Sequence, residues 1–131
     1  MNKLGNLRLC GMGWFKLHIS NLVSNRDIIL KWNGEALRRN SRPSKVYARM
    51  FSHTPLSLNE FLNYSEFLSD CDYLIIGNGY EGRMVVMEDL IDYFRKHGIR
   101  FSIKDTPDAV AEFFDLIREN ERVCLLVHLT C

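Results

Sequence analysis

Hydrophobic and polar residues change their spacing near residue 55 of this 131-residue chain. Before that point apolar residues alternate over short stretches, roughly so at 14–19, and 27–32 is a short run typical of a strand. Asn33 and Gly34 follow it and suit the positive φ angles of a type I′ turn, so 27–32 and 35–38 are predicted to form a β-hairpin. Segment 38–55 has no clear period. There we expect a long surface connection with a short strand at 46–50.

After residue 55 the spacing alternates between the helical and the strand period, which predicts the order αβαβαβ. The expected elements, in chain order, are a helix after Ser57, strand 73–77, a helix from Glu88 to Gly98, strand 99–103, a helix after Thr106 and strand 122–129. Short buried strands that alternate with helices are typical of α/β domains. We therefore predict one α/β domain over residues 1–131, with an N-terminal β-hairpin annex.

Two sequence signals mark helix starts. Ser57-Leu58-Asn59-Glu60 fits a capping box, in which the Ser57 hydroxyl and the Glu60 carboxylate each accept a hydrogen bond from the other residue's backbone amide. Thr106 is predicted to be the N-cap of the last helix, with Pro107 in its first position.

Gly77, Gly79 and Gly82 have the spacing of the dinucleotide-binding fingerprint. That fingerprint needs a helix that begins inside the glycine turn, because the helix N-terminus binds the pyrophosphate. Here the first helix-start signal is Glu88, and residues 84–87 are apolar and β-prone. We therefore predict that the glycines bend the chain as it leaves a buried strand and do not bind a dinucleotide.

The glycine turn nevertheless lies at the carboxyl end of a predicted strand, where open α/β sheets bind ligands. Backbone amides and an arginine at this place would suit a small anion or a peptide terminus. The candidate residues of such a ligand cleft are Gly77, Asn78, Gly79, Tyr80, Gly82, Arg83 and Thr106.

Charge is divided unevenly along the chain, although the net charge is +1. Residues 1–55 hold ten Lys or Arg and two acids, whereas residues 56–131 hold seven Lys or Arg and fourteen acids. A basic surface is predicted at Arg38, Arg39, Arg42, Lys45 and Arg49. Such a segment favours association with an unknown protein partner or self-association with the acidic half of another copy. Weak nucleic-acid binding through 38–53 is less favoured, since no recognition-helix or RNP-like signature accompanies the basic residues.

The composition, 47% hydrophobic and 25% charged, is ordinary for a globular protein. No apolar run approaches the ~20 residues that cross a bilayer, and the N-terminal sequence lacks the apolar core of a secretory signal. The four cysteines, Cys10, Cys71, Cys124 and Cys131, form no CxxC pair. We therefore expect reduced thiols in a cytoplasmic protein without membrane contact.

Histidine spacing gives no sign of a metal site, because none of the four histidines lies at paired ligand spacing. If strand 122–129 alternates, His128 shares a face with Cys124, Leu126 and Thr130, and we expect it to be half-buried and hydrogen-bonded. The sequence favours a protein with no metal, no cofactor and no catalytic residue.

The stretches DYLIIGNGYEG, at 72–82, and KHGIRFSIKDTPDAVAEFFDLIRENERVCLLVHLTC, at 96–131, resemble the small Mth-type domain family. The similarity covers roughly 12–131 and includes the predicted hairpin at 27–38. It implies a three-layer β+α/β/α fold with a mixed central sheet of about five strands, one of them antiparallel. It also implies a family of unknown biochemical function, whose members include an adipogenesis-associated protein and a mitochondrial complex I assembly factor.

The function that these observations favour is that of a non-catalytic interaction or assembly protein. One alternative is a small-ligand-binding or enzymatic domain that uses the turn 77–82 at the carboxyl edge of the sheet. A second alternative is a weak nucleic-acid binder that uses the basic segment 38–53.

Overall fold

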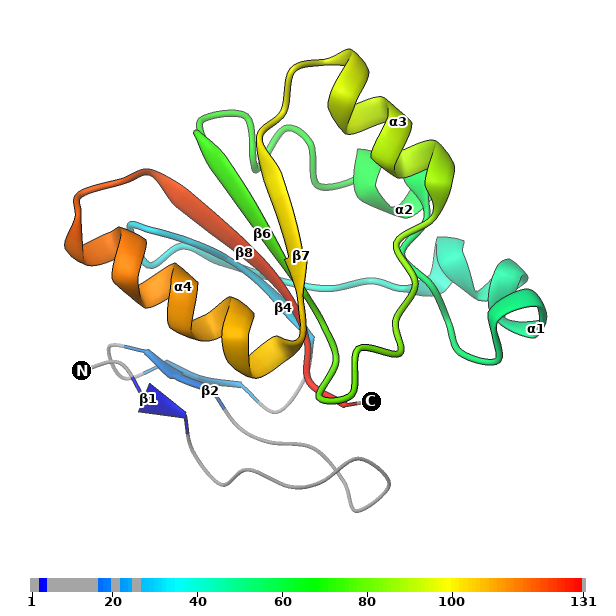
Figure 1. Ribbon diagram of the computed structural model, residues 1–131, viewed down its shortest axis with the longest axis horizontal. Helices are drawn as coiled ribbons and strands as arrows, with labels where there is room; N and C mark the ends of the chain where they lie inside the picture. Colours follow the sequence, from blue (N-terminus) through cyan, green and yellow to red (C-terminus); the bar gives the residue numbers. More distant parts are fainter. Residues whose placement is uncertain (1–2, 5–16, 20–21, 25–26, 131) are drawn as a thin grey trace.

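The computed structural model describes residues 3–4, 17–19, 22–24 and 27–130, and within them a five-stranded sheet has the order β5-β4-β8-β6-β7 (Figure 1). Its strands are β4 Ile28–Lys31, β5 Ala36–Arg38, β6 Tyr73–Asn78, β7 Phe101–Lys104 and β8 Val123–His128. β6 is parallel to β7 and β8, whereas β4 is antiparallel to both β5 and β8. The predicted α/β fold with a mixed sheet is confirmed, and β4 is the strand of this sheet that runs against the others.

Helices cover both faces of the sheet. α4, Thr106–Arg118, packs on one face, and α2, Leu58–Leu62, and α3, Glu88–Lys96, pack on the other (Figure 1). The described N-terminal strands β1 Lys3–Leu4, β2 Leu17–Ile19 and β3 Leu22–Ser24 form a separate antiparallel sheet. The predicted hairpin at 27–38 is present, but it forms the edge of the central sheet and is not a separate annex. The predicted alternation at 14–16 lies outside the described residues.

The β4–β5 turn uses one residue with positive φ. Gly34 has a φ of 94°, and Asn33 is not among the residues with positive φ. The Gly34 amide donates to the Lys31 carbonyl (3.0 Å), and the Lys31 amide donates to the Glu35 carbonyl (2.9 Å). This is the pattern of a type I turn followed by a G1 bulge. The predicted type I′ turn is wrong because a three-residue loop needs the left-handed conformation at its last residue alone.

The short strand predicted at 46–50 is also wrong. η1, Arg42–Tyr47, is a 3₁₀ helix, and α1, Ala48–Phe51, continues it as a short α-helix. Pro43 lies in the first turn of η1, where a missing amide costs no hydrogen bond. Ser44 points inward and its hydroxyl binds Ser57 Oγ at 2.8 Å and Glu60 Oε1 at 2.5 Å. These long-range contacts hold the segment helical against the β propensity of Val46.

Helix starts after residue 80 agree in part with the predictions. α3 begins at Glu88, beyond the glycine turn, so the turn does not open a helix as a dinucleotide fingerprint requires. α4 is capped by Asp105, whose carboxylate accepts from the Asp108 amide at 3.1 Å. The prediction of Thr106 as the cap is wrong, because Thr106 is the first helical residue and its hydroxyl points into the interior.

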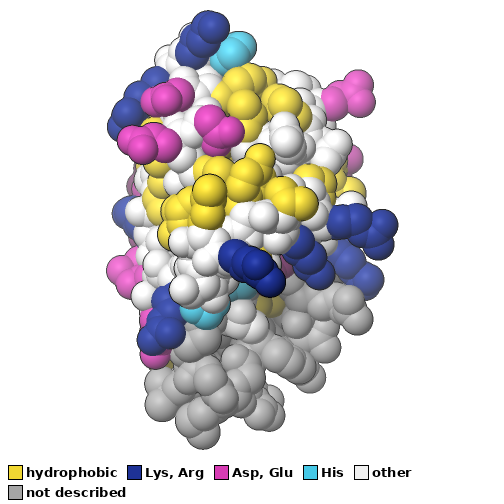
Figure 2. Space-filling model, turned by 90° about the vertical axis from the view of Figure 1, so that its right-hand side faces the viewer, with side chains coloured by type: hydrophobic (Ala, Val, Ile, Leu, Met, Phe, Trp, Pro, Cys, Tyr) yellow, Lys and Arg dark blue, Asp and Glu magenta, His cyan; other side chains and the backbone are white. Residues whose placement is uncertain are grey.

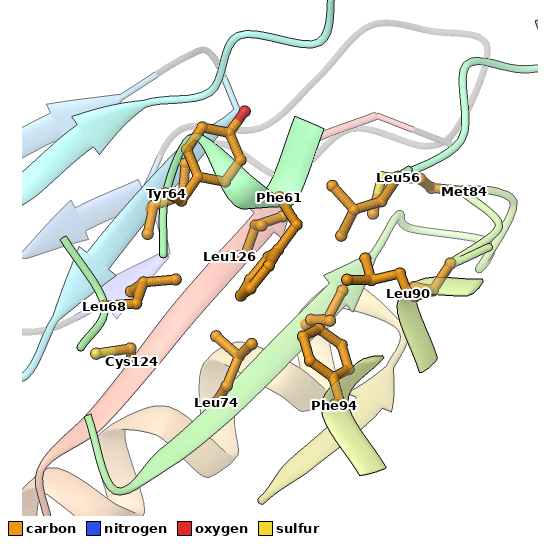
Figure 3. Close-up of a cluster of buried hydrophobic side chains, with 13 residues drawn as sticks. Leu56, Phe61, Tyr64, Leu68, Leu74, Met84, Leu90, Phe94, Cys124 and Leu126 are labelled. Atoms are coloured by element: carbon orange, nitrogen blue, oxygen red, sulfur yellow. The ribbon is translucent and has the colours of Figure 1, made fainter. Parts of the chain in front are cut away.

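The two faces of β8 carry the two halves of the core. Leu125 packs with Phe113 of α4, while Leu126 packs with Phe61 of α2 and Phe94 of α3 (Figure 3). The rings of Phe61 and Phe94 meet edge to face with centroids 4.9 Å apart, which adds about 0.5–1.5 kcal/mol to their burial. Helices on both faces therefore explain why the sequence of β8 is a continuous apolar run.

A disulfide joins Cys71 to Cys124, with the Cα atoms 6.0 Å apart. Cys71 precedes β6, and Cys124 lies in β8, which pairs with β6. The expectation of reduced thiols is wrong for this pair. Adjacent parallel strands bring together cysteines 53 residues apart, and sequence spacing does not reveal that pairing. Cys10 and Cys131 lie outside the described residues.

Candidate functional site

A buried ion pair links Arg39, just after β5, to Glu60 of α2. The Glu60 side chain is 0% exposed, and Arg39 Nε and Nη2 donate to its two oxygens at 2.7 and 2.9 Å. The hydroxyls of Ser44 and Tyr64 also donate to this carboxylate, each at 2.5 Å. The Ser57 hydroxyl accepts from the Glu60 amide at 3.1 Å, so this half of the predicted capping box is confirmed. The other half is wrong, because the Glu60 carboxylate is directed to Arg39.

The surroundings of the ion pair shift the pKa values of two groups, Arg39 and Tyr64. Burial lowers the pKa of Arg39, but the hydrogen bond and charge of Glu60 and the charge of Asp27 outweigh it and raise that pKa above its ordinary value. Burial raises the pKa of the Tyr64 hydroxyl, and its hydrogen bond to Glu60 raises that pKa further. Arg39 thus stays charged and Tyr64 stays protonated at neutral pH, as expected of a structural network and not of an acid–base pair that exchanges protons.

Asp27 connects this ion pair to the end of β8. Its Oδ2 accepts from Arg39 Nη1 at 3.0 Å and lies 2.7 Å from His128 Nδ1, while its Oδ1 accepts from the Leu129 amide at 2.9 Å. His128 Nε2 lies 3.0 Å from Thr130 Oγ1. Burial raises the pKa of Asp27, but the hydrogen bond and charge of His128 and the charge of Arg39 bring that pKa below its usual value. His128 is therefore half-buried and hydrogen-bonded, as predicted.

Two of the predicted cleft residues, Gly77 and Thr106, meet where β6 contacts α4. A Cβ on Gly77 would lie 3.1 Å from Thr106 Oγ1 and 3.2 Å from Ala109 Cβ, so glycine lets the helix pack closely on the strand. Thr106 Oγ1 accepts from the Gly79 amide at 2.9 Å and donates to the His128 carbonyl at 2.6 Å. This buried hydroxyl therefore joins β6, β8 and α4 in the interior.

Tyr80, Gly82 and Arg83 lie closer to solvent than Gly77, Gly79 and Thr106 do. The amides of Tyr80 and Gly82 donate to carbonyls of the chain at 2.6 and 3.2 Å. Arg83 is exposed and pairs with Glu81 at 2.9 Å. Asn78 Oδ1 is buried, and among the described residues it has no hydrogen-bond partner. Ligand binding by the turn stays a prediction, although the amides of Tyr80 and Gly82 already donate within the chain.

The predicted basic surface separates into two parts. Arg38, Arg42, Lys45 and Arg49 are exposed. The assignment of Arg39 to this surface is wrong, because its side chain is buried against Glu60. Sequence reasoning missed the ion pair. The available signal was an ionisable residue, Glu60, directly before the apolar Phe61 on a helix whose first turn faces the core.

Exposed apolar side chains lie among the remaining basic residues. Val46 and Met50, on η1 and α1, are 79% and 75% exposed, and Val85, before α3, is 38% exposed. A groove of about 370 Å³ is lined by Val85, by Ile91 and by Phe51, which directly follows Met50. Figure 2 shows apolar side chains in the middle of this side of the molecule, basic groups below and to the right of them, and both acidic and basic groups above them. We define the α1 face as Arg42, Lys45, Val46, Arg49, Met50, Phe51, Val85, Glu88, Asp89 and Ile91.

A second hollow, of about 450 Å³, lies at the opposite end of β6 from the glycine turn. Phe61, Leu74 and Tyr93 line it together with residues 97–100 at the end of α3. None of the predicted cleft residues lines this hollow.

Metal and membrane features can be assessed for the described part of the chain. Residues 27–130 and the short N-terminal strands contain no group of three or more His, Cys, Asp or Glu arranged to hold a metal ion. Among the helices described, none has the length and apolar character needed to cross a membrane.

Sequence and structure comparisons now assign the chain to a family. The model of a family described as "Protein of unknown function (DUF498/DUF598)" matches residues 8–128. The chain belongs to this family. The DUF498/DUF598 chain is also similar to solved structures, of which three are described below. Their sequences are at most 20% identical to this chain, so the likeness shows the fold alone.

The first of these structures is the conserved hypothetical protein PH1505 from Pyrococcus horikoshii OT3. It is 20% identical with a TM-score of 0.69, and the match covers 98% of this chain and 99% of that chain. XCC1710 from Xanthomonas campestris is 17% identical with a TM-score of 0.65, covering 95% of this chain and 83% of that chain. An outer membrane protein from Bartonella henselae is 15% identical with a TM-score of 0.65, covering 88% of each chain. The expectation of a small α/β family of unknown function is confirmed.

Proposed function

We propose that this protein is a non-catalytic interaction module of the assembly-factor kind, and that it binds a protein partner through the α1 face. The observation that carries the proposal is the exposure of Val46 and Met50, at 79% and 75%, beside an open groove. Burying a side chain of this size in a contact stabilises it by about 1.5–3 kcal/mol. Large apolar side chains that gather on a surface are typical of interaction sites.

Charge around the apolar side chains supports a protein partner. Lys45 and Arg49 lie on the same short helical stretch as Val46 and Met50, so a contact here would have an apolar centre and a charged rim. Charged rims raise association rates and select partners by complementarity. The resemblance to the Mth-type family, whose members include an assembly factor, agrees with this proposal.

The same features weigh against nucleic-acid binding. A nucleic-acid surface needs a continuous row of cations or exposed aromatic rings for base stacking. Here exposed Val46 and Met50 interrupt the cations, and Arg39 is withdrawn into the interior. We expect any association with DNA or RNA to be weak at physiological salt.

The test compares three forms of the protein in affinity purification from native cells. The double variant Val46→Asp/Met50→Asp adds charge to the α1 face, and Ala111→Asp adds a charge to exposed α4, on the other face of the sheet. We expect the same partner proteins with wild type and Ala111→Asp, and their loss with the double variant. Identical partners for all three forms would refute the assignment of the α1 face.

A second candidate function, enzymatic, is favoured by one observation. Asp27, His128 and Thr130 are hydrogen-bonded in the order carboxylate, imidazole, hydroxyl, which is the order of a hydrolytic triad. A fluorophosphonate probe distinguishes the candidates. Labelling at Thr130 that is lost in His128→Ala would favour hydrolysis, and we expect no labelling because Asp27 and His128 serve to hold β8 to the rest of the sheet.

The proposed location is the cytoplasm. The Cys71–Cys124 disulfide weighs against it, because disulfides persist mainly in oxidising compartments. Thiol blocking during cell lysis followed by mass spectrometry decides the question. Alkylated Cys71 and Cys124 agree with a reducing cytoplasm, whereas an intact disulfide in freshly lysed cells contradicts it.

A further inference from the structure

The α1 face carries charges of opposite sign on its two margins. Lys45 and Arg49 lie on η1 and α1. Glu88 and Asp89 lie at the start of α3 and line the groove together with Phe51. Val85, which is exposed, also lines this groove. In Figure 2 basic groups lie below the apolar patch, and acidic groups lie above it together with other basic groups.

We propose that the partner of the α1 face is the α1 face of a second copy, related by a two-fold axis. This inference rests on the proposed function, because it names the occupant of the same face. In a two-fold contact the same patch meets itself, and when the axis runs along the apolar side chains between the margins, each margin faces the opposite margin of the partner. Lys45 and Arg49 of one copy then lie against Glu88 and Asp89 of the other, twice in the complex.

A partner of one charge sign would fit this face less well, because it would be repelled at one margin. The net charge of +1 places no strong overall repulsion between two copies. The uneven distribution of charge along the sequence also favours association of two copies. The basic segment of one copy then meets acidic residues from the C-terminal half of the other.

The centre of the contact accommodates the exposed apolar side chains. Met50 is unbranched and flexible, a type of side chain that fills irregular gaps. The groove of about 370 Å³, which Phe51 and Ile91 help to line, has room for a methionine side chain from the second copy. Val46, one turn earlier, packs at the axis beside its counterpart. Each copy therefore supplies both a side chain and a groove.

Sedimentation velocity over a concentration series tests the inference with the full chain. Wild type is expected to dimerise reversibly, and Met50→Asp to dimerise at least about tenfold more weakly. Two charge variants sharpen the test, Lys45→Glu/Arg49→Glu and Glu88→Lys/Asp89→Lys. In a dimer of either variant alone, like charges would face each other at both margins, so each variant is expected to be monomeric. An equimolar mixture of the two restores opposite charges at both margins and is expected to form a heterodimer.

The matched control is Arg118→Glu on the exposed end of α4, which changes charge away from the α1 face and is expected to dimerise as wild type does. Circular dichroism confirms that each variant is folded, and Met50→Asp leaves the start of α3 unchanged. A wild type that stays monomeric at every concentration overturns the inference. So does a dimer that Met50→Asp and both charge variants leave intact, or a mixture that stays monomeric.

The outcomes separate the inference from the proposed function. If wild type is monomeric but Val46→Asp/Met50→Asp loses its cellular partners, the α1 face binds another protein, and the second copy is excluded as its occupant. If neither dimerisation nor partner recovery responds to changes on the α1 face, both proposals are overturned.

Discussion

Removing one partner of the buried Arg39–Glu60 ion pair is expected to lower the free energy of unfolding strongly, although the substitution leaves the surface of the protein unchanged. Arg39→Met leaves Glu60 fully buried without its cation, with hydrogen bonds from Ser44 and Tyr64 remaining. Removing one partner of a buried pair typically costs about 3–5 kcal/mol, because the other charge stays buried and uncompensated. Domains of this size are stable by about 5–15 kcal/mol, so the variant is expected to fold with a much reduced free energy of unfolding.

Glu60→Leu is expected to cost less than Arg39→Met. Arg39 would keep Asp27 at 3.0 Å and the Pro55 carbonyl at 3.0 Å as partners. In the double variant Arg39→Met/Glu60→Leu neither charge is left unpaired in the core. Its cost is therefore expected to be about 2–3 kcal/mol smaller than the sum of the single costs, since contacting residues are coupled by up to this amount.

Urea denaturation followed by circular dichroism measures the free energy of unfolding of each variant in this double-mutant cycle. Arg118→Met is the matched control, because Arg118 pairs with Asp115 on the exposed surface and its loss is expected to change stability by less than about 0.5 kcal/mol. A cost for Arg39→Met below about 1 kcal/mol, or costs that add within about 0.5 kcal/mol, would refute the reasoning.

Three further predictions concern other parts of the fold. Asp27 has a pKa below its unfolded value of 3.8, so its ionised form stabilises the fold above that pH and the stabilisation is lost as pH falls through the folded pKa. In Asp27→Asn the free energy of unfolding is expected to fall less steeply than in wild type as the pH drops below 3.8. Gly77→Ala is expected to cost about 1–3 kcal/mol in urea unfolding, because the added methyl meets Thr106 atoms at 3.1 and 3.3 Å. Reduction of Cys71–Cys124, which closes a loop with a separation of 53 residues, is expected to lower the free energy of unfolding by about 4 kcal/mol.

Each of these predictions has its own control. An acid limb of equal slope in wild type and Asp27→Asn would contradict the linkage argument. For Gly77→Ala the control is Ser69→Ala in an exposed turn, with an expected change within about 0.5 kcal/mol, and equal effects of the two substitutions would contradict the packing argument. For the disulfide, Cys71→Ala/Cys124→Ala should be insensitive to dithiothreitol, and a wild type that is equally insensitive would contradict the expected stabilisation.

The candidate site was less accessible to prediction than the fold. The exposed cations Arg42, Lys45 and Arg49 are visible in the sequence, but the sequence predicts a strand for their apolar neighbours, in which alternate residues would face the core. Val46 and Met50 are exposed because Ser44 is held by Ser57 and Glu60, and that contact joins segments that no local pattern relates.

The sequence by itself determined the elements from β6 to β8. Apolar periods, Gly98 after α3 and the acidic residues at the starts of α3 and α4 are local signals, and they act on residues within a few positions of one another. Tertiary structure decided the burial of Arg39, the pairing of Cys71 with Cys124 and the bond between Asp27 and His128. Those contacts depend on β8 inserting between β4 and β6, so residues up to about a hundred positions apart become neighbours, and the strand order that places them together is set by the packing of the whole sheet.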